Sequence, residues 1–71
     1  MEKYNYTVKY TDRWGEPNES DFRSLKESLK FAIRAAKESN EKAFVDEYDH
    51  DGIVYGTFWW EVEPDGSWRR H

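Results

Sequence analysis

Residues 53–62 read Ile-Val-Tyr-Gly-Thr-Phe-Trp-Trp-Glu-Val, and this stretch predicts a strand with large side chains on both of its faces. Successive side chains of a strand point to opposite faces. One face is apolar throughout apart from a glycine, which indicates a β-bulge: Val54, Gly56, Phe58, Trp60 and Val62. This set is the predicted core face. Tyr55 and Trp59 then lie on the opposite face.

One helix is expected upstream of this strand, over residues 25–39. Apolar residues recur there on one helical stripe: Leu25, Leu29, Ala32, Ile33 and Ala36. Ser24 and Glu27 fit a capping box at its start, with a start at Ser20 or Asp21 as the alternative. Asn40 suits the left-handed position that ends a helix.

The other elements complete an α+β domain that spans residues 1–71. Residues 4–10 alternate as a strand, and residues 12–20 are predicted as a loop because they hold Gly15, Pro17 and Asn18. Strands are also expected at 43–48 and 67–70, with turns at 49–52 and 63–66. We therefore predict an antiparallel sheet of about four strands with one helix packed on one face, in the order β-α-β-β-β.

The aromatic content exceeds what so small a core needs. The 71 residues include four Trp, five Tyr and four Phe, and a single helix covers only one face of a sheet. Rings on the other face then meet a partner, because exposed Trp and Tyr are typical interface anchors. Two alternatives stay open. In the first, cross-strand pairing fixes the rings within the molecule and the 12–20 loop folds over them. In the second, the open sheet face forms the interface of a homodimer.

Acidic residues concentrate in the second half of a chain whose net charge is −4. Residues 43–65 contain no Lys or Arg and seven acids, which are Asp46, Glu47, Asp49, Asp51, Glu61, Glu63 and Asp65. Such a surface attracts a protein with a basic surface, for example a groove that normally holds nucleic acid, and so acts as a DNA mimic. The alternative is a solvated edge that discourages aggregation. The predicted partner-binding residues are Asp46, Glu47, Asp49, Asp51, Tyr55, Trp59 and Glu61.

Basic residues concentrate on the predicted helix, within one sector of about 80° beside the apolar stripe. They are Arg23, Lys26, Lys30, Arg34 and Lys37. A one-sided basic stripe follows phosphates, so nucleic acid is the secondary partner that we consider, with exposed aromatics stacking on bases. The alternative is an ordinary solvated helix face.

Several classes of function are not expected. The chain has no Cys and no catalytic or phosphate-binding motif, so we predict no enzyme, no catalytic residues, no metal and no cofactor. No run of apolar residues is long enough for a membrane span, and the first residues do not form a signal peptide. We therefore expect a cytoplasmic protein.

The order of elements, together with Ser24-Leu25, the alanine-spaced helix (Ala32, Ala36) and Asp65-Gly66-Ser67-Trp68, resembles small phage-encoded anti-CRISPR proteins that inhibit type I complexes. The resemblance implies stoichiometric binding to a CRISPR-Cas effector in the host cytoplasm, which blocks target DNA binding or nuclease recruitment. Because this chain lacks an overall basic surface, it implies docking onto basic surfaces of the effector.

Overall fold

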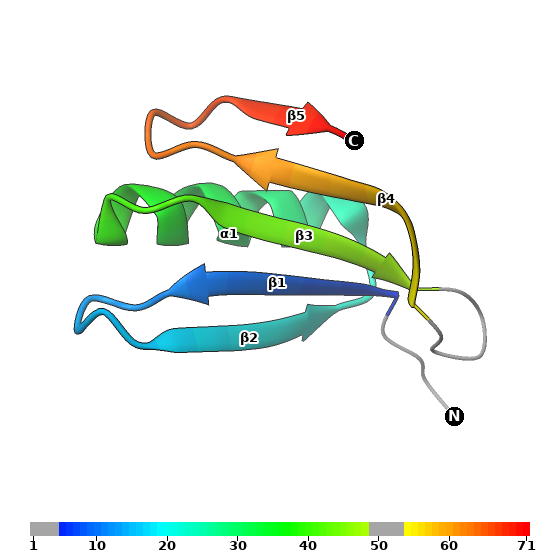
Figure 1. Ribbon diagram of the computed structural model, residues 1–71, viewed down its shortest axis with the longest axis horizontal. Coiled ribbons are helices and arrows are strands. Elements are labelled where there is room, and N and C mark those ends of the chain that lie inside the picture. Colours follow the sequence, from blue (N-terminus) through cyan, green and yellow to red (C-terminus); the bar gives the residue numbers. More distant parts are fainter. Residues whose placement is uncertain (1–4, 49–53) are drawn as a thin grey trace.

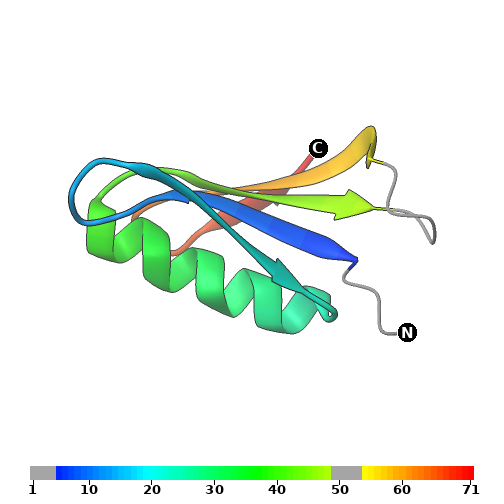
Figure 2. The same ribbon diagram turned by 90° about the horizontal axis from the view of Figure 1, so that it is seen from below.

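The computed structural model describes residues 5–48 and 54–71. Its elements are β1 (Tyr6–Thr11), β2 (Pro17–Phe22), α1 (Leu25–Ser39), β3 (Ala43–Tyr48), β4 (Val54–Val62) and β5 (Trp68–Arg70). The strands form one antiparallel sheet in the order β2-β1-β3-β4-β5, and α1 lies along one face of it (Figures 1 and 2). The predicted α+β class, with one helix and an antiparallel sheet, is confirmed.

The helix begins and ends where its capping residues predict. The Ser24 side chain accepts a hydrogen bond from the Glu27 amide at 3.3 Å, and Asn40 adopts the left-handed conformation with φ 58°. An earlier start is wrong, since Ser20 and Asp21 belong to β2. Local side chain to backbone hydrogen bonding therefore sets the boundaries of α1.

The strand β2 corrects the prediction of a loop over residues 12–20 and raises the sheet to five strands. β2 is a polar edge strand in which Phe22 is the largest apolar residue, so it lacks the alternation that marks a strand. Its first residue is Pro17, a position where a strand tolerates the missing amide hydrogen. Hydrogen bonds within the turn stabilise this hairpin, in place of the apolar alternation that β2 lacks. Asp12 accepts hydrogen bonds from the backbone amides of Trp14 and Glu16, both at 2.9 Å.

The core lies between α1 and the central strands. Its side chains are small or aliphatic apart from Trp60, which is 5% exposed, and the fully buried members are Val8, Ala32, Ala36, Ala43, Val45 and Val62. Because alanines face the sheet, the helix approaches the strands closely. Rings close the sides of this core, with Phe31 5.1 Å from both Tyr10 and Phe22 between ring centroids. Phe31 is outside the stripe predicted from the sequence.

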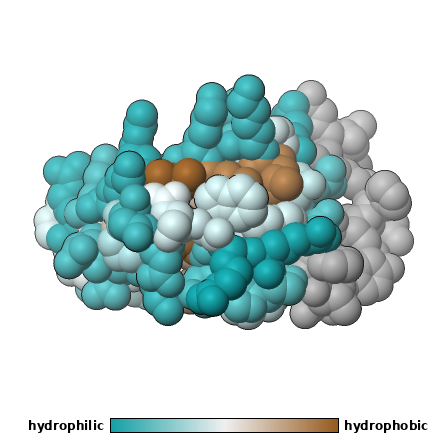
Figure 3. Space-filling model, turned by 90° about the horizontal axis from the view of Figure 1, so that it is seen from above, coloured by the Kyte–Doolittle hydropathy of each residue, from teal (hydrophilic) through white to brown (hydrophobic). Residues whose placement is uncertain are grey.

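The helix covers only part of its face of the sheet. It packs mainly on β1 and β3 and less on β2 and β4, and among the described elements the backbone of β5 does not approach it closely. Trp68 of β5 is consequently 52% exposed. Seen from the β5 edge, Figure 3 shows apolar surface at the centre of the molecule, enclosed by hydrophilic side chains.

Close approach of α1 gives a testable prediction about stability. Ala36→Leu should lower the free energy of unfolding by about 1–3 kcal/mol, because the buried site has no room for the larger side chain. Urea unfolding followed by circular dichroism measures it. Lys30→Leu on the exposed side of the same helix is the matched control, and equal effects of the two changes would contradict this packing.

Candidate binding surface

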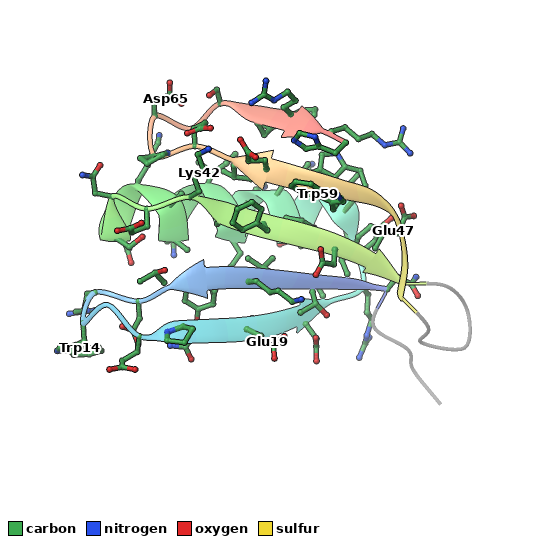
Figure 4. All side chains as sticks on the ribbon, viewed as in Figure 1. Trp14, Glu19, Lys42, Glu47, Trp59 and Asp65 are labelled. Atoms are coloured by element: carbon green, nitrogen blue, oxygen red, sulfur yellow. The ribbon has the colours of Figure 1, made fainter. Side chains whose placement is uncertain are left out.

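The face of the sheet that α1 does not cover, here called the open face, carries Trp59. Trp59 and Trp60 follow each other in β4, and Trp60 is buried against the helix side. Trp59 therefore points the other way, as the alternation predicts. In Figure 4 the open face is turned toward the viewer, with Trp59 on β4, the strand between β3 and the edge strand β5.

Three rings form a continuous row on the open face, the aromatic row Phe44 of β3, Trp59 of β4 and His71, which directly follows β5. The Phe44 and Trp59 ring centroids are 5.7 Å apart and tilted by 53°. Trp59 and His71 are stacked at 4.0 Å with 14° between their planes. The strands fix this order, since the His71 amide donates to the Trp59 carbonyl at 2.7 Å and the Trp59 amide donates in return at 3.4 Å. Cross-strand contacts thus hold Trp59 in place.

Ion pairs flank the aromatic row on both sides. Lys9 of β1 contacts Asp46 of β3 at 3.0 Å. On the other side of the row, the Glu61 carboxylate forms ion pairs with Lys42 and Arg69, each at 3.3 Å. Glu61 is only 12% exposed, and the Lys42 ammonium donates a hydrogen bond to it, which lowers the pKa of Glu61 and raises the pKa of Lys42.

The predicted partner-binding residues do not form one patch. Asp46, Trp59 and Glu61 share the open face. Glu47 lies on the helix side, because it pairs in register with Tyr6, whose ring packs against the core. Burial, and then the nearby Glu47 charge, raise the pKa of Tyr6. Asp49, Asp51 and the Tyr55 side chain lie outside the described part of the structure.

The structure adds open-face residues that sequence reasoning missed. Phe44 and His71 flank Trp59, and Glu19 and Asp21 belong to β2, which had been predicted as a loop. Asp21 accepts a hydrogen bond from the Thr7 hydroxyl at 2.7 Å. On the described part of this face the carboxylates Glu19, Asp21, Asp46, Glu61 and Glu63 outnumber the cations Lys9, Lys42 and Arg69. The face is acidic, although less so than the sequence suggested.

The basic stripe lies on the other side of the molecule. Lys26, Lys30, Arg34 and Lys37 are exposed along α1, and Arg23 precedes the N-cap, outside the helix. This stripe and Trp59 therefore face in different directions. A different tryptophan, Trp14, lies closer to the stripe at the tip of the β1–β2 hairpin and is 76% exposed (Figure 4).

Beside Trp14 is an open pocket of about 200 Å³ between the hairpin loop and the C-terminal half of α1. Its aromatic lining comes from Tyr10, Trp14 and Phe31. Its charged lining consists of two bases and two acids, which are Arg13, Arg34, Asp12 and Glu38. Drug-sized ligands occupy pockets of about 300–1,000 Å³. This pocket therefore suits one ring-sized group of a larger molecule.

No family model, curated protein or solved structure matches the chain. Across residues 5–48 and 54–71, no three His, Asp or Glu side chains gather as a metal site. In the same residues no helix has the length and apolar character that crossing a membrane requires.

The network around Glu61 predicts a measurable titration. Because the folded-state pKa of Glu61 lies below its ordinary 4.5, this carboxylate stabilises the fold above that pH, and the contribution is lost as the pH falls through the lowered pKa. An NMR titration of the side-chain carboxyl should place its midpoint below 4.5. Lys42→Met should raise that midpoint. Lys9→Met, which removes the partner of Asp46, should leave it in place, and equal shifts in both variants would contradict the assigned pairing.

Proposed function

We propose that this chain is a small non-enzymatic binding protein whose open face docks onto a basic surface of a protein partner. The aromatic row Phe44, Trp59 and His71, on the face that the helix leaves uncovered, is the observation that carries this proposal. Aromatic side chains are the commonest anchors of protein interfaces, and here three of them adjoin.

Preorganisation supports the same conclusion. Trp59 lies between Phe44 and His71, and backbone hydrogen bonds fix the strands that carry the last two rings of the row. A ring that is already held loses little conformational freedom on binding, so more of its contact energy appears as affinity. The face is also large enough for an interface. The molecule measures 33 × 22 Å in this plane, about 700 Å², near the roughly 800 Å² per partner of a standard interface.

The charges around the aromatic row favour a basic partner. Asp46 and Glu61 already have intramolecular partners, so they set orientation at the rim more than they supply binding energy. Glu19 is exposed on the edge strand β2 and extends the acidic surface. Complementary charge of this kind speeds encounter and excludes wrong partners.

The target class comes from the resemblance to small anti-CRISPR proteins. We propose a CRISPR-Cas effector complex as the partner, bound stoichiometrically in the host cytoplasm so that target DNA binding or nuclease recruitment is blocked. The effector offers basic surfaces that normally hold nucleic acid, and the acidic open face would occupy one of them as a DNA mimic.

Trp59→Ala tests the proposed anchor. With a purified type I surveillance complex, the variant should bind at least about 10-fold more weakly than the unchanged protein, because a buried interface tryptophan is a typical hot spot. Calorimetry or surface plasmon resonance measures the affinity. Trp59 is half-buried, and Trp68→Ala, which removes a more exposed tryptophan on the helix side, is the control.

Two results would contradict this proposal. One is the absence of a complex with any type I effector in size-exclusion chromatography. The other is equal weakening by both tryptophan changes. Light scattering of the protein alone distinguishes the remaining interpretation, since a homodimer that Trp59→Ala converts to a monomer would assign the open face to self-association.

Charge reversal at the edge strand gives a kinetic prediction. Glu19→Lys should lower the association rate with the effector and reduce its dependence on salt, with a smaller change in dissociation rate. Glu38→Lys makes the same charge change on the helix side and is the control. If Glu38→Lys slows association as strongly, the acidic open face does not steer the encounter.

A further inference from the structure

We propose that the pocket beside Trp14, together with the exposed basic face of α1, binds single-stranded nucleic acid at a site separate from the open face. One base would enter the pocket and stack on Trp14, while the phosphates run along the basic face. This site does not depend on the identity of the protein partner.

The pocket has the composition of a base-stacking site. Three of its lining residues are aromatic, namely Tyr10, Phe31 and Trp14. Arg13 and Arg34 supply cations, while of the two acids in the lining, Asp12 already accepts three hydrogen bonds within the loop and Glu38 stands beside Arg34. Its volume of about 200 Å³ suits a single ring system. Aromatic rings combined with cations are how proteins bind single strands, since every base offers a π-face.

The loop that carries Trp14 is ordered by its own hydrogen bonds. Asp12 organises the loop, accepting from the Trp14 and Glu16 amides through one oxygen and from the Asn18 side chain through the other at 2.7 Å. Gly15 allows the tight turn with a φ of 80°. The Arg13 guanidinium carbon is 5.1 Å from the Trp14 ring centroid. An ordered loop thus presents a ring that is 76% exposed, with a cation already against it.

Arg34 connects the pocket to the rest of the basic face. It lines the pocket, and Lys30 and Lys26 precede it at intervals of one helical turn, about 6 Å apart along the axis. All three side chains are exposed. A phosphate backbone leaving the pocket therefore meets a succession of cations on the same side of the molecule.

The observations favour nucleic acid over an acidic protein segment. A nucleic acid strand and an acidic protein segment can both pair with the cations. A stretch of Asp and Glu, however, has no ring that could stack in the aromatic pocket. The acidic open face also repels a polyanion, which directs it to the helix side. Because the net charge of the chain is −4, the binding should be modest and strongly weakened by salt.

Fluorescence anisotropy with a fluorescein-labelled oligothymidylate tests the site. A length of about 12 nucleotides lies within the range that single-strand-binding sites cover. At low salt the protein should bind, and raising the salt several-fold should release the strand. Trp14→Ala should weaken binding about 10-fold, and Trp14→Phe, which keeps a ring, should restore part of the loss. Arg34→Gln should weaken binding and reduce the salt slope by about one.

The controls lie on the other surfaces. Trp59→Ala and Arg69→Gln remove a ring and a cation from the open face and its border, and both should leave oligonucleotide binding unchanged. Absence of binding at low salt would overturn the proposal. Equal affinity of Trp14→Ala and the unchanged protein would overturn it as well. So would polyglutamate of similar length binding as tightly as the oligonucleotide, since that result would assign the site to acidic proteins.

Discussion

The whole arrangement depends on one helix packing closely on one face of a sheet that is wider than the helix. Ala32 and Ala36 bring α1 against β1 and β3, where Val8 and Val45 are fully buried. In a domain this small the fraction of buried surface is low, so this single contact supplies most of the core. The open face, β5 and the tip of the β1–β2 hairpin lie outside this contact, and Trp14 at that tip and Trp68 of β5 are exposed.

The alternation of one strand places large side chains on both faces of the sheet. Trp60 enters the core and Trp59 cannot, because consecutive side chains of a strand point to opposite faces. Neighbouring strands then supply Phe44 and His71 on either side of Trp59. These contacts leave Trp59 half-buried. Adjacent residues of β4 therefore belong to the core and to the proposed binding surface, and a change at Trp59 is expected to leave the core intact.

Local sequence patterns predicted α1, but they did not predict β2, the strand that forms through a turn. The Ser24 side chain accepts from the Glu27 amide and Asn40 adopts the left-handed conformation, so the bounds of α1 follow from local sequence. β2 has almost no apolar alternation, and it forms because Asp12 and Gly15 close a turn beside β1, a signal that does not by itself specify a strand. The register between strands determines which side chains are neighbours in the candidate site. The position of Glu47 opposite Tyr6, and the neighbours of Trp59, follow from pairings between distant segments that no short pattern encodes.

The distribution of charge over the two sides bears on whether the two proposed surfaces act independently. Acidic groups gather on the open face, where Lys9, Lys42 and Arg69 neutralise part of them, and basic groups gather along α1. Trp14 lies at the tip of the β1–β2 hairpin and Trp59 on β4, well apart in Figure 4. Changes at two distant residues without a shared partner combine additively. A flat partner can cover only one of the two surfaces at a time, whereas a nucleoprotein that surrounds the domain can engage both, its basic protein surface against Trp59 and its single strand against Trp14.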